Sequence, residues 1–231
     1  MLTELVEAGP RFRKGAGLTM VYTILGALAA LVVSFVFGLM SLSGSVVVRG
    51  LSRVVVEFFR GTSLVVQLLW IFFVLPQLGL RFEPMAAATL AFGLNFGAYG
   101  AEVVRGAITS VPKTQWEATV ALGLSRYRRM TRVILPQALP EMVPPFGNLW
   151  IQILKSSSLL YLIGITELTF EVKQLQFEMG SMAAFSIALV VYFLLAQILV
   201  ALTRWVEVRT ASRVGRGPKA IAIEAPNPAA T

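Results

Sequence analysis

Three polar side chains recur along one face of an otherwise apolar segment, residues 84–105. Asn95, Tyr99 and Glu102 are separated by four and three positions, and Gly106 follows four positions later. Residues at these spacings share one face of an α-helix. Polar groups cost free energy when they face lipid, so this face is expected to line a bundle interior or a watery path. Asn95 falls near the middle of the segment, where membrane-embedded solute sites lie.

A second polar series follows a cluster of prolines. Glu141, Asn148, Gln152 and Lys155 recur at intervals of seven, four and three positions. The prolines are expected to prevent a continuous helix through the start of this segment. They are Pro136, Pro140, Pro144 and Pro145. Broken helices whose free backbone groups face a cavity build solute sites in membranes. A cavity lined by an acid and Lys155 would suit a zwitterion.

Each polar residue also has a purely structural interpretation. Asn95, Gln152 and the serines of 156–158 can hydrogen-bond between helices. Lys155 can extend its amine to the outer interface instead of lining a path. The hypothesis of a substrate pathway covers Asn95, Tyr99, Glu102, Asn148, Gln152, Lys155 and Ser157.

The composition limits what these residues can do. The 231 residues are 56% hydrophobic and 14% charged, and they include no Cys, His or Asp. Zinc sites built from Cys and His and catalysis by histidine bases are therefore excluded. No Gly-Lys-Ser/Thr phosphate loop is present either, so we expect no cofactor or metal on this chain, and another chain to hydrolyse any ATP. The net charge of +8 resides in the gaps between apolar runs, which is unlike a nucleic-acid platform.

The apolar runs predict an all-α membrane protein with five transmembrane helices. About 20 apolar residues are needed to cross the hydrocarbon layer. The expected spans are 18–40, 61–80, 84–105, 142–166 and 179–203, the fourth being interrupted by Lys155. The first run has 23 uncharged residues, which is too long for a signal-peptide core, so it is expected to be retained.

The basic residues predict how the chain is oriented. One set of alternate loops contains 14 of the 20 Lys and Arg residues, and the other set contains 5. The positive-inside rule then places 1–17 outside and the C-terminus in the cytoplasm, although Arg11, Arg13 and Lys14 oppose this orientation. Residues 210–231 are rich in Ala, Pro and Gly, which predicts a disordered cytoplasmic tail.

A polar connector, 112–123, separates the third and fourth spans on the predicted cytoplasmic side. Thr114 and Glu117 have the spacing of a capping box, and Gly123 is placed for a C-cap. These signals predict a short helix over 115–122. A second helix start is expected at Ser125, with a break or kink at Pro136.

The connector and its flanks resemble a known family. Glu117-Ala118-Thr119, three residues, Gly123, nine residues and Val133-Ile134-Leu135-Pro136 are similar to the E-A-A-x₃-G-x₉-I-x-L-P loop of ABC importer permeases. Further segments resemble permeases of the polar amino acid uptake subfamily. They are 57–68, 94–118, 135–148 and 154–168.

The sequence departs from the family pattern at three positions. Thr119 replaces the second Ala of the loop, and Val133 replaces Ile. Ser156 stands where relatives usually have Asp or Asn, which leaves the charge preference for the substrate open. The subfamily includes carriers of ectoine-type compatible solutes and of glutamate, glutamine, histidine and arginine. The segments 97–106 and 144–148 resemble the ectoine carriers slightly more.

The resemblance implies a type I importer permease in the plasma membrane. Such a subunit pairs with an identical or paralogous permease, receives solute from an extracytoplasmic binding protein, and binds an ATPase subunit that carries ATP and Mg²⁺. It implies that 112–123 is a coupling helix. The implied coupling residues are Glu117, Ala118, Thr119, Gly123 and Pro136.

Two other classes of function stay open on the sequence alone. An ATP-independent channel for solutes or ions would need no rigid cytoplasmic helix. An intramembrane enzyme would have to use a pair such as Ser157 with Lys155, because Cys, His and Asp are absent.

Overall fold

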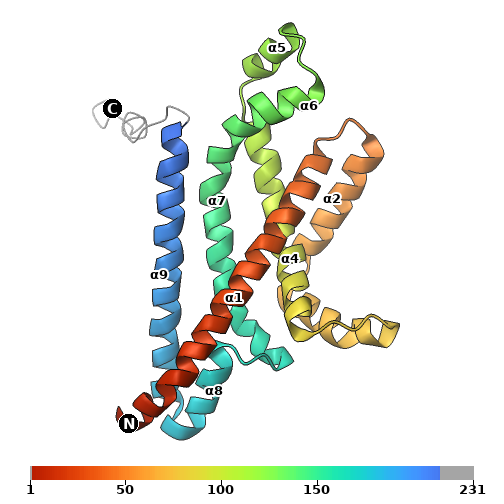
Figure 1. The fold of residues 1–231 in the computed structure, drawn as a ribbon. Helices are drawn as coiled ribbons and strands as arrows, with labels where there is room; N and C mark the ends of the chain where they lie inside the picture. Colours follow the sequence, from red (N-terminus) through yellow and green to blue (C-terminus); the bar gives the residue numbers. More distant parts are fainter. Residues whose placement is uncertain (1, 214–231) are drawn as a thin grey trace, which may run out of the picture.

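The computed structural model describes residues 2–213, with the side chains of residues 9–210, and this part of the chain contains helices and no strands (Figure 1). The α-helices are α1 (Leu2–Ser41), α2 (Val46–Gly61), α3 (Leu64–Leu69), α4 (Pro84–Thr109), α5 (Lys113–Ala121), α6 (Arg126–Arg129), α7 (Leu135–Ser156), α8 (Leu168–Met179) and α9 (Ser181–Arg213). The π-helical turns are η1 (Trp70–Val74) and η3 (Met130–Ile134), and the 3-10 segments are η2 (Leu75–Leu78) and η4 (Ser157–Ile163).

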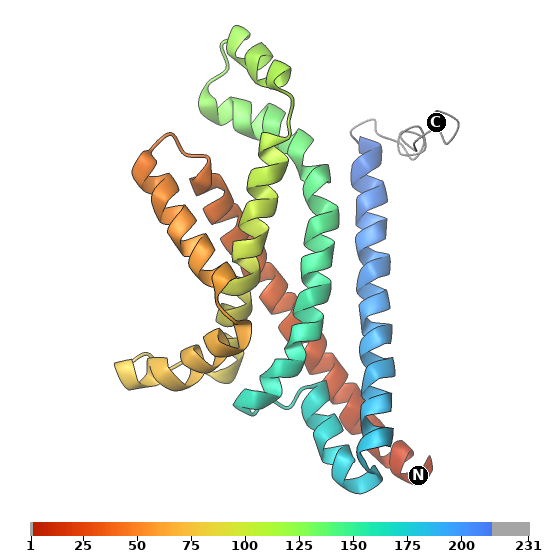
Figure 2. The same cartoon turned by 180° about the vertical axis from the view of Figure 1, so that it is seen from behind.

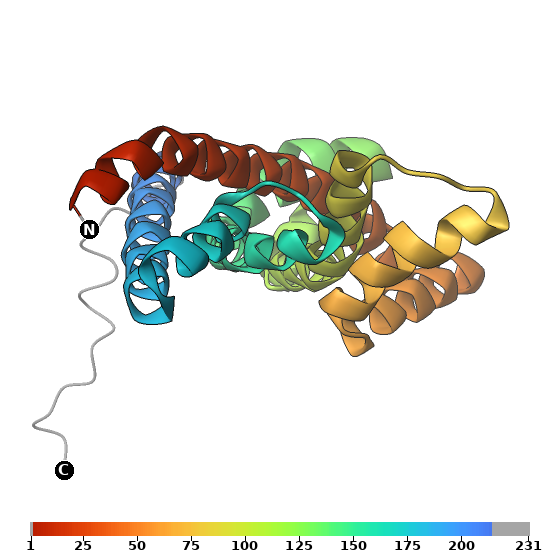
Figure 3. The same cartoon turned by 90° about the horizontal axis from the view of Figure 1, so that it is seen from below.

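The long helices form a bundle with two distinct ends. α4 and α7 run side by side through its middle, α1 crosses them obliquely, and α9 flanks α7 (Figures 1 and 2). The short helices α5 and α6 project beyond the end that also carries the C-terminal end of α9. The start of α1 and all of α8 lie at the opposite end, and the view along the bundle shows α2 and α3 on the side away from α9 (Figure 3).

Small residues allow α1 and α4 to approach closely. A Cβ atom on Gly93 would lie 2.8 Å from Cβ of Ala29, and one on Gly97 would lie 2.5 Å from Cβ of Val33. The hydroxyl of Ser34 on α1 donates to the backbone carbonyl oxygen of Gly97 on α4 at 3.2 Å, and this hydrogen bond links the two helices. Gly93 and Gly97 therefore form part of a close-packing surface of small residues on α4.

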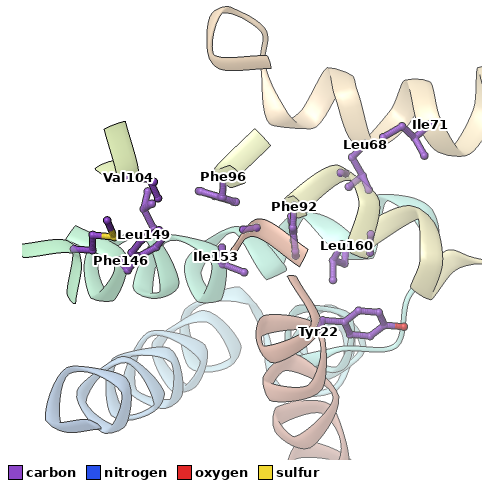
Figure 4. Close-up of a cluster of buried hydrophobic side chains, with 14 of the residues drawn as sticks. Tyr22, Leu68, Ile71, Phe92, Phe96, Val104, Phe146, Leu149, Ile153 and Leu160 are labelled. Atoms are coloured by element: carbon purple, nitrogen blue, oxygen red, sulfur yellow. The ribbon is translucent and has the colours of Figure 1, made fainter. Parts of the chain in front are cut away.

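The main apolar core fills the space between α1, α4 and α7. Phe92 and Phe96 from α4 stack edge to face with centroids 6.1 Å apart, and Ile153 from α7 and Tyr22 from α1 lie in the same cluster (Figure 4). Leu160 of η4 is fully buried there, so the segment after α7 is part of the core. This core fixes the two central helices that carry most of the predicted site residues.

The helices differ in how they could cross a membrane. Within the described chain, two single helices are long and apolar enough to span: Gly9–Ser41 and Ser181–Thr210. Two bent pairs qualify together: Val46–Gly61 with Leu64–Leu78, and Arg126–Ile163 with Leu168–Met179. α4, which covers the predicted span 84–105, is absent from this set because its Gly, Asn, Thr and Tyr residues lower its mean hydropathy.

The predicted second span, 61–80, does not qualify as a spanning helix without α2. The chain bends by 102° between Val46–Gly61 and Leu64–Leu78, so residues 61–80 begin at the bend and run away from α2. The sequence prediction failed because α2 carries arginines on one face, which removed it from the apolar runs.

The prediction that prolines break the fourth span at its start is also wrong. α7 is continuous from Leu135 to Ser156 with Pro140, Pro144 and Pro145 inside it. Pro136 lies in its first turn, where a missing N–H is tolerated, and the π-helical turn η3 precedes it. The change of conformation comes after Lys155, where η4 begins, and the chain then bends by 62° into α8.

The ends of the chain differ from the predicted boundaries. α1 begins at Leu2, so most of the predicted external segment 1–17 continues the first helix. α9 continues to Arg213, so residues 210–213 of the predicted tail are helical. The remainder of that prediction, 214–231, lies outside the described residues.

Candidate transport pathway and coupling site

The side chains of Asn95 and Tyr99 donate hydrogen bonds to backbone carbonyl groups at the end of α2. The side-chain nitrogen of Asn95 donates to the carbonyl oxygen of Phe59 at 3.1 Å, and the hydroxyl of Tyr99 donates to the carbonyl oxygen of Arg60 at 3.2 Å. The last carbonyl groups of a helix have no partner within it, and a lipid environment supplies none. The two predicted pathway residues therefore stabilise the bend between α2 and α3.

Gln67 completes this arrangement, and the sequence analysis missed it. Its side-chain nitrogen donates to the carbonyl oxygen of Phe59 at 2.9 Å and also bonds the hydroxyl of Thr62. Its side-chain oxygen is buried without a partner, and Gln67 is one of the residues that line an apolar cavity of about 310 Å³ between α2, α3 and α4. Its position four residues after Ser63 in an apolar run was the available signal, because an amide there must find a partner.

Glu102 lies apart from Asn95, toward the α5 end of α4. Its carboxylate accepts from Arg105 Nη2 at 2.6 Å, which forms an ion pair one turn apart on α4. Both side chains line a cavity of about 510 Å³ between α1, α2 and α4. The face predicted from the spacing of Asn95, Tyr99 and Glu102 therefore lies toward α2, but it serves two different local environments.

The polar series on α7 has a different setting. Asn148, Gln152 and Lys155 are exposed on one face of α7, and no hydrogen bond or ion pair links any of their side chains to another described residue. Glu141, two turns earlier on this face, is also exposed and does have a partner. A helix at the centre of a membrane bundle thus presents polar side chains away from its own chain.

Ser157 does not share that exposed face. It is fully buried, and its hydroxyl donates to the carbonyl oxygen of Leu154 at 2.7 Å. This bond lies within the turn where α7 changes to η4, so the geometry supports the structural interpretation of Ser157. The buried position also separates its hydroxyl from exposed Lys155, which weighs against a Ser–Lys catalytic pair.

The connector forms the helix α5, close to the predicted bounds. Its N-cap is Pro112, and no side chain caps it, so the predicted capping box of Thr114 and Glu117 is wrong. The predicted glycine stop is confirmed: Gly123 has φ +65°, its N–H bonds the carbonyl oxygen of Val120, and Leu124 N–H bonds that of Thr119. This pair of hydrogen bonds forms a Schellman motif. The predicted helix start at Ser125 is also confirmed, since its hydroxyl accepts from Arg128 N.

The predicted coupling residues lie on two sides of α5. Glu117 and Ala118 are exposed, whereas Thr119 is buried and its hydroxyl donates to the carbonyl oxygen of Trp116 at 2.6 Å. Thr119 therefore faces inward and offers no outer contact surface. The departure from alanine at this position gains an internal hydrogen bond. Pro136 is exposed at the start of α7.

α5 is tied to the bundle but leaves apolar side chains uncovered. Gln137 of α7 donates to Gln115 at 3.4 Å, and Trp116 packs against the main core. Val120 and Leu122 are 57% and 75% exposed at the tip of the bundle. Apolar residues exposed beside Glu117 form a surface suited to a protein partner.

A buried carboxylate at the opposite end was not predicted. Glu167, which is fully buried, accepts hydrogen bonds from Thr19 of α1 at 3.3 Å, from Tyr192 of α9 at 2.9 Å and from Phe170 N of α8 at 3.1 Å. Thr169 bonds the Tyr192 hydroxyl at 2.8 Å. Glu167 therefore joins α1 to the consecutive helices α8 and α9, and the only sequence signal was a glutamate beside an apolar segment.

Comparison with known proteins agrees with this geometry. Residues 23–212 match the family described as the inner membrane component of binding-protein-dependent transport systems. The chain is 45% identical over 201 residues to a probable amino-acid ABC transporter permease protein, y4tF, of Sinorhizobium fredii, covering 84% of each chain. It is 41% identical over 162 residues to the glutamine transport system permease protein GlnP of Escherichia coli K12, covering 69% of this chain and 74% of that protein.

Solved structures give the same fold. An amino acid ABC transporter crystallised with histidines matches with a TM-score of 0.83 at 30% identity, covering 90% of this chain and 98% of that chain. The inward-facing MetNI methionine ABC transporter matches with a TM-score of 0.71 at 18% identity, covering 86% and 95%, which supports the fold alone. The chain belongs to the family of binding-protein-dependent transport system inner membrane components and has the fold of an ABC importer permease.

Proposed function

We propose that this ABC permease subunit carries a polar amino acid or a related zwitterion, and that the exposed polar face of α7 lines its path. The observation that carries the proposal is the lack of partners for the side chains of Asn148, Gln152 and Lys155 within the described chain. Exposed polar groups on a membrane helix are costly in lipid, so they face water or another subunit. A second permease subunit packed near this face would enclose a polar chamber.

Lys155 supplies a charge suited to such a solute. It lies at the end of α7 beside the change to η4, and its ammonium is available to a ligand carboxylate. Asn148 and Gln152 offer both donors and acceptors on the two preceding turns. Asn95 contributes indirectly, because its amide nitrogen holds the bend of α2.

The coupling surface is proposed to be Glu117, Ala118 and the exposed tip of α5. ATP and Mg²⁺ would be held by a separate ATPase subunit, and a binding protein would deliver the solute on the opposite face. Closing of the ATPase subunits would push α5, which is stiffened by its glycine stop and its bond to α7. Movement of a rigid element of this kind transmits force between two sites.

The orientation follows from the same proposal. α5 and the C-terminal end of α9 share one end of the bundle, and we place that end in the cytoplasm with the N-terminus outside. The concentration of Lys and Arg in the loops at this end supports the orientation.

The names of the relatives favour an amino acid over an ectoine-type solute. The aligned proteins include permeases named for glutamine and for L-cystine transport. The solute is tested by isothermal calorimetry of the cognate binding protein with amino acids and with ectoine. Binding of ectoine without binding of any amino acid would replace the substrate class but retain the pathway.

The pathway is tested with Lys155→Ala in the full importer reconstituted in liposomes. Loss of a charged hydrogen bond of about 1.5 to 3 kcal/mol predicts a rise in the KM for solute of roughly tenfold or more. Lys173→Ala is the matched control, because that ammonium lies 5.5 Å from the ring centroid of Phe185 on another helix pair. An unchanged KM in Lys155→Ala would return Lys155 to the interfacial interpretation. Uptake by the purified permease without ATPase would support a channel.

A further inference from the structure

The polar face of α2 lines a cavity that has no part in the proposed solute path. Arg49, Arg53, Glu57 and Arg60 of α2 line the cavity of about 510 Å³ together with Arg105 of α4. The volume is in the range of small-ligand pockets. The opposite face of α2 is apolar and exposed, as at Leu51 (56%), Val54 (66%) and Phe58 (59%).

The charges in this cavity are unequal. Four arginines and two glutamates line it, and Arg105 neutralises Glu102. Glu57 can balance one of the remaining three arginines, which leaves an excess of two positive charges. A cavity with this excess attracts an anion.

The remaining arginines have donors available for a ligand. Arg53 makes no hydrogen bond or ion pair with the described residues, and Arg60 lies 5.3 Å from the ring centroid of Tyr99, which leaves the edge of its guanidinium open. Arg49 uses one nitrogen on the carbonyl oxygens of Ser43 and Gly44, at 2.8 and 3.1 Å. Guanidinium groups bind phosphate oxygens in bidentate pairs.

The cavity also lies at the end of a candidate membrane span. The span Gly9–Ser41 of α1 ends at Ser41, which lines the cavity. We propose that this cavity binds a phosphate-bearing anion at the membrane surface. Basic pockets between membrane helices bind anionic headgroups, and the exposed apolar face of α2 gives acyl chains a surface to lie on. This site is independent of the solute path on α7.

The test compares Arg53→Gln/Arg60→Gln with Arg128→Gln, an exposed arginine at the same end of the bundle but outside the cavity. The full permease with its partner subunits is purified, and native mass spectrometry measures retention of phosphatidylglycerol against phosphatidylcholine. A second arm measures binding of inorganic phosphate to the delipidated complex by calorimetry. We expect the double variant to weaken binding about tenfold or more, and Arg128→Gln to bind like wild type.

The two arms identify the source of the phosphate. Selective retention of phosphatidylglycerol without binding of free phosphate assigns a lipid, and the reverse assigns a soluble anion. Equal binding by wild type and double variant would overturn the proposal. Wild type that neither retains phosphatidylglycerol over phosphatidylcholine nor binds inorganic phosphate would also overturn it. A lower fraction of assembled permease pairs in the double variant, with lipid retention unchanged, would also overturn it, because a protein partner would then occupy the cavity. If the double variant does not fold, Arg53→Gln alone gives the comparison, and Arg53→Lys should restore binding.

Discussion

The side-chain amide of Asn95 on α4 and the backbone carbonyl of Phe59 on α2 are joined by a hydrogen bond of 3.1 Å. This bond links two helices at the point where the chain turns by 102° into α3. Asn95, in the middle of a predicted span, therefore stabilises the contact between α4 and the end of α2. This hydrogen bond also separates two interpretations of polar residues in this protein, because Asn148 has no comparable partner.

Asn95→Ala is expected to lower the thermal unfolding midpoint of the purified permease. The lost hydrogen bond contributes about 1 kcal/mol, and Gln67 still bonds the same carbonyl. Asn148→Ala is the matched variant: it should leave the midpoint unchanged and reduce uptake. If the two variants exchange these phenotypes, the pathway belongs to α4 rather than α7. Differential scanning fluorimetry and liposome uptake measure the two quantities.

Gly97→Ala is expected to destabilise the contact between α1 and α4. The added Cβ would lie 2.5 Å from Cβ of Val33, and overpacking of this kind costs about 1 to 3 kcal/mol. Gly106→Ala on the same helix meets nothing within 4 Å, so it should be neutral or stabilising. Thermal unfolding of both variants in the same detergent checks the difference. Similar midpoints would show that α1 can shift to accommodate the methyl group.

Gly123→Ala is expected to loosen α5 without affecting the span helices. A residue with φ +65° is strained by a side chain at a cost of about 1 to 2 kcal/mol, and no neighbouring atom obstructs the Cβ. We expect ATP hydrolysis to continue while the amount of solute transported per ATP falls. Glu117→Lys, which reverses a charge on the exposed face of α5, should also lower the amount of solute transported per ATP. Gly50→Ala, at an open position in α2, is the control. Full coupling in all three variants would exclude α5 as the element that transmits force.

Tyr192→Phe is expected to weaken the junction of α1, α8 and α9. The hydroxyl donates to Glu167 at 2.9 Å and is bonded to Thr169, so its removal should cost about 1 kcal/mol or more in a buried network. Tyr127→Phe removes an exposed hydroxyl from a side chain that is 77% exposed, and it should have no effect. Proteolysis of the N-terminal part of α1, compared between the two variants, measures the loss locally. Equal protection would mean that apolar packing alone holds this end.

The sequence predicted local features better than long-range ones. The glycine stop at Gly123 and the start at Ser125 depend on residues close in the chain, and both are confirmed. The capping box failed because Pro112 already begins the helix two residues before Thr114. The continuous α7 shows that packing from neighbouring helices can keep several prolines within one helix.

The network at Glu167 depends on residues about 150 positions apart, such as Thr19, and no local pattern reports such a contact. The bend after α2 is similar, because its stabilising groups come from α3 and α4. The burial of Ser157 was not predicted either, because this residue lies in η4, beyond the end of α7.

α4 contacts other helices on two sides, and a short connection joins it to the projecting helix α5. Its glycines contact α1, its polar side chains bond the end of α2, and only Ser110, Val111 and Pro112 separate it from α5. A displacement delivered at α5 would therefore carry α1, α2 and α4 together as one solid unit. The sliding that opens a chamber would then have to occur where this unit meets neighbouring surfaces, and the unsatisfied polar side of α7 would be part of that moving boundary.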